Sequence, residues 1–286
     1  MDLIPEIVTA KIREWRTGEK LPVVPVVPLR GIIGQMGPMR KGLTLEGVAG
    51  TLDRAFKVKN ASAVALIINS PGGSPVQSAL IARRIRQLAA EHNVKVIAFC
   101  EDVAASGGYW LAAAADEILV DENSIVGSIG VISSSLGFVE AIRKIGVERR
   151  LHTAGDKKSF MDPFLPEKKA DVTRLKEIQG DMHESFKAYV SERRGEKLKD
   201  DPTLFSGAFW TGRRAVDLGL ADGIGDIRPT LRERFGEKVR MPVFSERKSW
   251  LSRRFGGTSQ HTDVAIWADS LISAVEERVI WDRYRL

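Results

Sequence analysis

Apolar runs alternate with amphipathic stretches along the chain, and this pattern predicts strands separated by helices. Continuous apolar runs at 63–69, 94–100 and 117–121 have strand length, which is typical of strands covered on both faces. Apolar residues recur at helical spacing from Leu45 onward, before the first of these runs, and over 75–91, between the first two. Long crossovers between such strands favour an α/β fold with a mostly parallel sheet flanked by helices.

The flanking segments add further predicted elements. An opening strand is expected over 26–33, where prolines confine its start to an edge or extended segment. The stretch "VERRLHTAG" (147–155) predicts another strand, and a long helix over 167–193 follows it. Glycines in 218–226 predict turns. A last helix over 263–285 is separated from the sheet region by the linker "RRFGGTSQ".

These elements divide the chain into an N-terminal segment (1–20), a main domain (21–240) and a C-terminal extension with a terminal helix (241–286). In the first segment, apolar residues share one helical face with basic residues beside it. This helix is expected to dock on its own domain or on a neighbouring subunit, with membrane-surface contact as an alternative. Charged residues interrupt every apolar cluster, so neither a signal peptide nor a transmembrane helix is expected.

Composition narrows the classes of function. The chain has 286 residues, 43% of them apolar and 28% charged, which is enough apolar material for a sizeable core. The formal charge of +6 is mild, and no basic run is interleaved with aromatic residues, so nucleic-acid binding is not expected. The one cysteine, Cys100, lies in an apolar run and excludes a disulfide within one chain. It suggests a reducing compartment and is expected to be a buried apolar side chain rather than a nucleophile.

Two glycine-containing loops follow two of the predicted buried strands. One is "NSPGG" (69–73) and the other is "AASGG" (104–108), which places Ser106 at the start of a helix. Ligands of a doubly wound sheet bind beyond the carboxyl ends of its strands. A serine at a helix start is often only an N-cap. Such a serine is also suited to act as a nucleophile when free backbone N–H groups beside it form an oxyanion site. Here these would be the N–H groups of Gly72 and Gly107.

A serine nucleophile needs a base, and the sequence offers few candidates. Only one of the four histidines, His152, has a context worth retaining, because it precedes the lysine pair of "HTAGDKKSFMDPF" (152–164). A lysine can serve as the base where burial disfavours its charged form. A lysine pair in a loop is more often solvated, so this segment alone leaves the base open. The other three histidines are His92, His183 and His261.

Six motifs in order along 23–225 together resemble the S49 peptidases, the signal peptide peptidase A family of serine–lysine proteases. They are "VPLRGII", "INSPGGS", "VAASGGYWLAAAADEI", "VGSIGV", "TAGDKKSFMDPF" and "GRRAVDLGLADGIG". The resemblance implies a ClpP/crotonase-like α/β fold, here with terminal helical extensions. It implies Ser106 as nucleophile and, by the family spacing between a glycine and a proline, Lys158 as general base. Ser128 would orient the lysine, the N–H groups of Gly72 and Gly107 would form the oxyanion hole, and no metal or cofactor is implied.

The function expected from the resemblance is that of a serine endopeptidase acting on hydrophobic or unfolded peptides, with signal-peptide remnants among the candidate substrates. Members of the family form rings, so a homo-oligomer is expected, in which Ser106 and Lys158 meet either within a subunit or across an interface. Most members carry an N-terminal membrane anchor, whereas here the amphipathic segment 1–20 stands in its place. We therefore expect a cytoplasmic enzyme, with peripheral contact at the inner membrane face as an option.

Two other functions remain open from the sequence. A crotonase-like acyl-CoA enzyme would share the fold and the glycine oxyanion hole. It usually needs a carboxylate as acid or base, and Glu101, Asp102 and Asp116 lie in no motif that supports this role. An inactive ring-forming scaffold is the non-enzymatic alternative, against which the presence of both Ser106 and Lys158 argues.

Overall fold

The computed structural model describes residues 21–35, 42–245 and four residues near the C-terminal end. The predicted helix within 1–20 lies outside the described residues, as does most of the predicted helix over 263–285. Of the latter, Arg278, Trp281 and Asp282 are described and are helical. Over the part of the chain that is described, no helix combines the length and the apolar character needed to span a bilayer.

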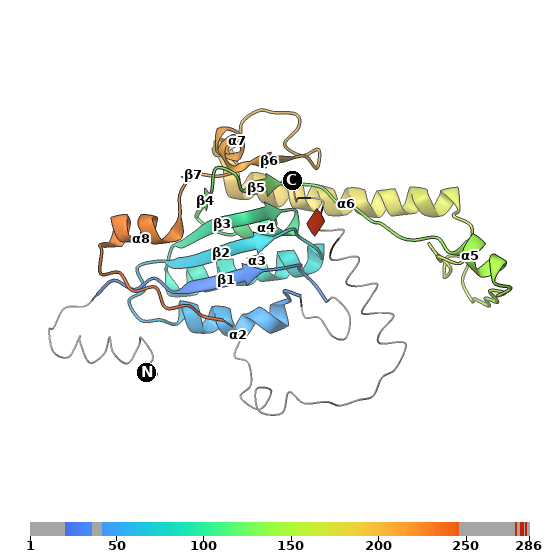
Figure 1. Cartoon of the computed structure of the whole chain (residues 1–286), viewed down its shortest axis with the longest axis horizontal. Coiled ribbons are helices and arrows are strands. Elements are labelled where there is room, and N and C mark those ends of the chain that lie inside the picture. Colours follow the sequence, from blue (N-terminus) through green and yellow to red (C-terminus); the bar gives the residue numbers. More distant parts are fainter. Residues whose placement is uncertain (1–20, 36–41, 246–277, 279–280, 283, 285–286) are drawn as a thin grey trace, which may run out of the picture.

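The centre of the molecule is a seven-stranded sheet in which every pair but one is parallel (Figure 1). The main path runs in the order β1-β2-β3-β4-β7, and β5 continues beside the end of β3. β6 pairs antiparallel with β5. The predicted mostly parallel sheet is therefore confirmed. The strands are β1 (Val26–Arg30), β2 (Val64–Ser70), β3 (Val96–Ala105), β4 (Glu117–Val120), β5 (Ile125–Gly127), β6 (Phe209–Thr211) and β7 (Gly223–Ile224).

Helices cover both faces of the sheet, as the continuous apolar runs predict. In β2, Val64 and Leu66 belong to the core shared with helices α2, α3, α4 and α6, whereas Ala65 packs in the opposite layer with Leu231 of α8. Local sequence sets the helix ends: Thr44 caps α2, and Ser74 caps α3. The helices are α2 (Leu45–Phe56), α3 (Pro75–His92), α4 (Gly107–Ala112), α6 (Lys169–Arg194), α7 (Gly212–Asp217) and α8 (Ile227–Phe235).

Two predicted strands have different lengths in the structure. β1 ends at Arg30 instead of at residue 33, because Gly31 takes a φ of +100° that no regular strand contains. β3 continues to Ala105, five residues past the predicted end. Its register against β2 shifts, since Ile68 pairs with Cys100 but Ser70 pairs with Ala104. Because of this irregularity, β3 continues through the polar residues that follow the apolar run.

The prediction of a strand over 147–155 is wrong. This segment has no strand partner among the described residues, and all nine of its residues are exposed. It belongs to a longer excursion, residues 131–168, which we call the arm. The arm contains the short helix α5 (Val139–Lys144), stands beyond the sheet in Figure 1 and is followed by α6. An apolar alternation without a neighbouring strand to pair with does not make a sheet.

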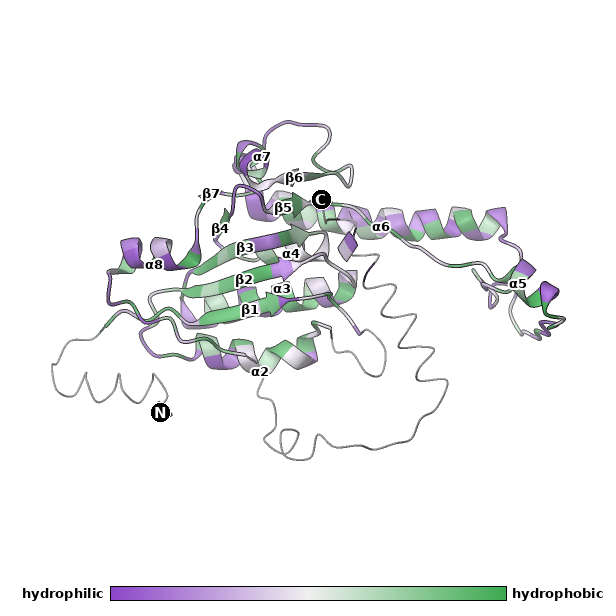
Figure 2. Cartoon of the chain, in the orientation of Figure 1, coloured by the Kyte–Doolittle hydropathy of each residue, from purple (hydrophilic) through white to green (hydrophobic). Residues whose placement is uncertain are grey.

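The arm is held together by its own contacts and leaves apolar side chains in solvent. The Phe138 N–H donates to the Pro163 carbonyl at 2.7 Å, and Arg149 pairs with Asp162 at 2.9 Å. None of the α5 residues is buried, and Ile145 is 74% exposed. Figure 2 shows apolar positions on α5 away from the sheet. Further exposed apolar side chains of the arm are Ile132, Leu136, Val147 and Leu151.

Candidate active site

Ser106 occupies the turn between the end of β3 and the start of α4. Its backbone angles are φ +53° and ψ −121°, which an L-residue with a Cβ rarely adopts. Its side chain makes no capping hydrogen bond to the helix, although it stands at the N-cap position. Helix capping by the side chain therefore does not explain why a serine stands at this position. Its partly exposed hydroxyl is left available for chemistry.

The two glycine loops lie against each other beside this serine. Gly72 has a φ of +100°, and a Cβ built on it would lie 2.8 Å from the Gly107 nitrogen and 2.8 Å from the Ser106 Cβ. Such contacts are closer than side chains allow, so only glycine permits this approach at position 72. The structure thus brings together three of the residues singled out in the sequence, namely Ser106, Gly72 and Gly107.

The backbone donors of these loops differ in their availability. The Gly107 N–H, at the first position of α4, has no acceptor among the described residues. The Gly72 N–H donates to the Ser70 Oγ at 3.2 Å. The Ile33 N–H donates to the Gly72 carbonyl, and the Ile33 carbonyl accepts from the Ser74 N–H. Ile33 and Gly73 thus form a parallel bridge in which the Gly73 N–H points away from Ile33. Sequence reasoning passed over Gly73, and the second glycine of "PGG" was its only signal.

Ser128 lies next to Ser106. The residues that precede the two serines, Gly127 and Ala105, are paired in the parallel register of β5 and β3. The Ser106 N–H donates to the Gly127 carbonyl at 2.8 Å. Ser128 also has a positive φ, +52°, and its Oγ accepts a hydrogen bond from the Tyr284 hydroxyl at 3.0 Å. Two hydroxyl groups therefore stand at adjacent strand ends.

Helix α4, which begins directly after Ser106, is fixed by aromatic and cationic contacts from α6. Trp110 stacks on Phe186 with ring centroids 4.4 Å apart and on Tyr189 at 5.4 Å. Arg193 donates to the carbonyl of Ala113 at 2.9 Å, just after the C-terminal end of α4. Stacked aromatic pairs and cations at a helix C-terminus are both stabilising. Their effect is to hold the turn that carries the serine.

Lys158 does not lie with Ser106 within one chain. It is exposed and sits in the arm, in a turn where its N–H donates to the Gly155 carbonyl at 3.2 Å. Figure 1 shows the part of the arm around α5 well separated from the β3–α4 turn. The surrounding residues of the same chain therefore do not bury this lysine. Lys157 is exposed in the same turn.

His152, His183 and Cys100 are not alternative partners for Ser106, and His261 lies outside the described residues. His152 is exposed in the arm. His183, which sequence reasoning set aside, contacts the Ile129 carbonyl through its Nε2 at 3.0 Å and so supports the segment after Ser128. Cys100 is buried as expected, and desolvation raises the pKa of its thiol to about 12. Among the described residues, no group of three or more His, Cys, Asp or Glu side chains could hold a metal ion.

The carboxylates that an acyl-CoA reaction would call for are all engaged. Each accepts hydrogen bonds from a neighbouring side chain, an arrangement that serves structure rather than proton transfer to a substrate. The pairs are Glu101 with Arg30 at 2.5 and 2.8 Å, Asp102 with Asn69 at 2.6 Å, and Asp116 with Arg86 at 2.7 Å.

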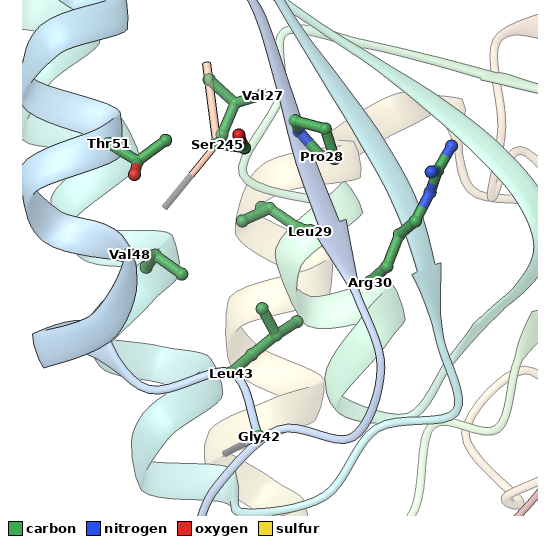
Figure 3. Close-up of a pocket in the computed structure, with 9 residues that line it drawn as sticks. All are labelled: Val27, Pro28, Leu29, Arg30, Gly42, Leu43, Val48, Thr51 and Ser245. Atoms are coloured by element: carbon green, nitrogen blue, oxygen red, sulfur yellow. The ribbon is translucent and has the colours of Figure 1, made fainter. Parts of the chain in front are cut away.

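A cavity of about 260 Å³ lies away from these residues, between α2 and the edge strand β1 (Figure 3). Its lining mixes aliphatic residues with polar ones, Thr51 and Ser245 among them. It contains neither a serine–lysine pair nor any of the site residues expected from the sequence. The remaining lining residues are Val27, Pro28, Leu29, Arg30, Gly42, Leu43 and Val48.

Two family models match the chain. The model described as "Peptidase family S49" matches residues 89–237, and the one described as "ClpP-like SDH-type serine proteinase" matches residues 8–155. The "Putative protease slr0021" of Synechocystis sp. is 30% identical over 257 residues, 86% of this chain and 89% of that protein. "Protease 4" of Haemophilus influenzae is 32% identical over 191 residues, 65% of this chain and 30% of that protein.

Higher identity is found within a longer protein. The "Na(+)/H(+) antiporter NhaA" of Brucella abortus is 51% identical over 271 residues, which are 92% of this chain and 37% of that protein. The chain thus spans little more than a third of the length of this relative. The antiporter name refers to the whole of that longer protein.

Proposed function

The chain belongs to peptidase family S49, and from this premise we propose that it is a serine endopeptidase acting on hydrophobic or unfolded peptides. Ser106 is the nucleophile and Lys158 the general base. The observation that carries the proposal is the geometry of Ser106. It is a partly exposed hydroxyl on a strained turn, free of capping bonds and flanked by the glycine loops. The packing of α4 gives no reason for a serine in this strained conformation. The role of an exposed nucleophile at a helix N-terminus does give a reason.

The proposed reaction uses only side chains and backbone of the protein. The Ser106 Oγ attacks the substrate carbonyl while its proton passes to the uncharged Lys158 amine. The negative oxygen of the tetrahedral intermediate accepts hydrogen bonds from the Gly107 N–H and from an N–H of the Gly72–Gly73 loop. Lys158 then protonates the leaving amine. A water molecule, deprotonated by Lys158, hydrolyses the acyl ester and restores the serine.

The position of Lys158 favours a site that two copies of the chain complete. In one chain the lysine is exposed in the arm, away from Ser106. The arm also exposes apolar side chains such as Leu136 and Ile145, at 68% and 74%, and its segment 147–155 pairs with no strand among the described residues. Contact with a neighbouring copy would cover these groups and desolvate the amine. We therefore assign Lys158 to the Ser106 of an adjacent subunit in a closed homo-oligomeric ring.

Location and substrate source form a separate part of the proposal. Residues 1–20 carry an amphipathic pattern that suits the surface of a membrane as well as a protein surface. We propose peripheral contact at the cytoplasmic face, with membrane-derived peptides such as signal-peptide remnants among the substrates. Deleting residues 2–20 and measuring flotation with anionic lipid vesicles tests this contact. Unchanged flotation would remove it and leave the peptidase assignment intact.

The decisive experiment compares matched serine and lysine variants of the full chain. Ser106→Ala and Lys158→Ala are each expected to lower kcat on an unfolded protein by at least about 10³-fold, because the residues of a nucleophile–base unit fail together. Lys157→Ala and Ser185→Ala are the controls, since both change exposed residues outside the proposed dyad. A fluorophosphonate probe should label Ser106 in the unaltered protein. Full activity of Ser106→Ala, or labelling elsewhere, would remove the assignment.

The structure does not favour the two other functions considered. The carboxylates available to an acyl-CoA enzyme are held by Arg30, Asn69 and Arg86. An inactive scaffold would have no use for a strained serine with a partly exposed hydroxyl, and labelling at Ser106 distinguishes the two cases.

A further inference from the structure

The far end of the chain returns to the candidate site. Tyr284 is only 5% exposed, and its hydroxyl donates to the Ser128 Oγ at 3.0 Å across a separation of 156 residues. Within the described residues, this tyrosine is the one side chain that bonds to the Ser128 hydroxyl.

The ring of Tyr284 lies under the strand ends that carry the two serines. It packs in a small apolar cluster with Val103 and Ala105 of β3 and Ile125 of β5. Its ring also meets Phe209 edge-on, with centroids 5.4 Å apart and an angle of 72°. Ala105 directly precedes Ser106, Val103 and Ile125 lie earlier on β3 and β5, and Phe209 lies on β6, which pairs with β5. The ring of Tyr284 thus contacts residues of β3, β5 and β6, and its hydroxyl bonds to Ser128.

We propose that Tyr284 is a positioning residue for the peptidase reaction, acting through Ser128. This inference rests on the proposed function, in which Ser128 orients the lysine. A serine hydroxyl has one proton to donate and two lone pairs, and it rotates freely unless its partners fix it. The Tyr284 O–H occupies one lone pair of Ser128. The other lone pair is then held in a defined direction to accept an N–H of the incoming Lys158 amine, whose own lone pair faces Ser106.

The proposal requires the hydroxyl of Tyr284 and not merely its ring. Tyr284→Phe keeps the ring contacts with Ala105 and Phe209 but removes the donor. The variant is expected to lower kcat by about fivefold with little change in KM, the size of effect typical of losing one neutral hydrogen bond. Fluorophosphonate labelling of Ser106 should slow by a similar factor. The melting temperature should fall only slightly, whereas Tyr284→Ala, which also loses the ring, should lower it much more.

A double-substitution cycle with Ser128→Ala separates positioning from plain packing. Once the Ser128 hydroxyl is gone, Tyr284→Phe should have no further effect on kcat, because the two groups act through one bond. Trp281→Phe, in the same apolar cluster, is the matched control and should leave kcat unchanged in either background. Equal effects of Tyr284→Phe with and without Ser128 would overturn the proposal.

An unchanged or increased kcat of Tyr284→Phe would also overturn it, and an increase would show that the tyrosine competes with lysine or substrate for Ser128. These results can be told apart from those expected if the proposed peptidase function is wrong. If Ser106→Ala keeps full activity, the peptidase mechanism falls. If Ser106→Ala is inactive and only Tyr284→Phe is silent, the mechanism stands and the role of Tyr284 falls.

Discussion

Ser106 and Ser128 occupy matching positions at the ends of two paired parallel strands, and both have left-handed backbone angles. Their φ values are +53° and +52°, and the Ser106 N–H donates to the carbonyl of Gly127, the residue before Ser128. A non-glycine residue in this conformation is strained, and two such residues side by side hold two hydroxyl groups at one edge of the sheet. Glycine would fit both positions with less strain, so the hydroxyl groups themselves explain the serines.

Removing the strain at Ser106 should stabilise the fold while abolishing activity. Ser106→Gly is expected to be about 1 kcal/mol more stable than Ser106→Ala, because glycine adopts a positive φ without a Cβ clash. Both variants lack the nucleophile, so the difference between their free energies of unfolding reports the backbone strain at this position. Urea unfolding of the two variants measures it. An alanine variant as stable as the glycine variant would show that the turn is not strained.

Mixing two inactive variants tests whether the site is shared between subunits. In a ring assembled at random from equal amounts of Ser106→Ala and Lys158→Ala chains, about a quarter of the interfaces combine an intact serine with an intact lysine. The mixture, after dissociation and reassembly, should regain about that fraction of the original activity. Mixtures that stay inactive at every ratio, although they form mixed rings, would place the dyad within one chain.

The arm should govern assembly without governing folding. Ile145→Glu places a charge on a side chain that is 74% exposed in the single chain, so the fold should tolerate it. If a neighbouring copy covers that side chain, the charge must be desolvated and the oligomer should dissociate, with loss of peptidase activity. Sedimentation velocity measures the assembly state. Val243→Glu, at an apolar side chain that is 64% exposed outside the arm, should leave the assembly unchanged.

The sheet and its covering helices could be predicted because their causes are local in sequence. An uninterrupted apolar run such as that of β2 is stable only when covered on both faces, and the structure covers it so. The turn at Ser106 could likewise be placed, because a buried strand, a serine and two glycines follow one another directly. Its strained angles could not be read from the sequence, since they accompany a close approach of Gly72 to Gly107 that only the folded chain contains.

Contacts between distant segments explain what the sequence did not show. Residues 147–155 have a strand-like composition, but no strand of the described chain lies beside them. The bond between Tyr284 and Ser128 links residues in different parts of the chain, and neither residue type signals the other. His183 was set aside because its helical neighbours are charged, yet it faces the Ile129 carbonyl. Each case depends on tertiary packing, which periodicity and motif spacing do not encode.

The buried thiol should be irrelevant to catalysis. Cys100 is 5% exposed, and burial raises its pKa to about 12, so almost no thiolate exists at neutral pH. Iodoacetamide should therefore leave the native protein unmodified and fully active, whereas the urea-unfolded chain should react. Mass spectrometry follows the modification. Loss of activity together with native labelling of Cys100 would contradict the burial seen here.

The stability of the domain should fall in acid through the Asp222 carboxylate. Burial alone would raise its pKa, but hydrogen bonds from Arg194, Lys197 and the Ile118 N–H hold the pKa below its usual range. Because the folded pKa lies below the unfolded value of about 3.9, the stabilisation is complete above that pH and is lost as the pH falls through the folded pKa. The buried Arg194 joins the end of α6 to the turn before β7 through this carboxylate.

Asp222→Asn isolates this contribution, since it keeps the shape and removes the charge. The variant should be less stable than the unaltered protein by about 3 kcal/mol at pH 7, because the buried Arg194 guanidinium loses its counter-ion. The difference should shrink as the pH falls below about 4, where the carboxylate binds a proton in the unfolded chain and, at still lower pH, in the folded chain. Asp217→Asn, at a side chain that is 61% exposed, serves as the control and should change stability little. A difference between Asp222→Asn and the unaltered protein that stays constant from pH 7 to pH 3 would show that loss of the carboxylate's charge is not the cause.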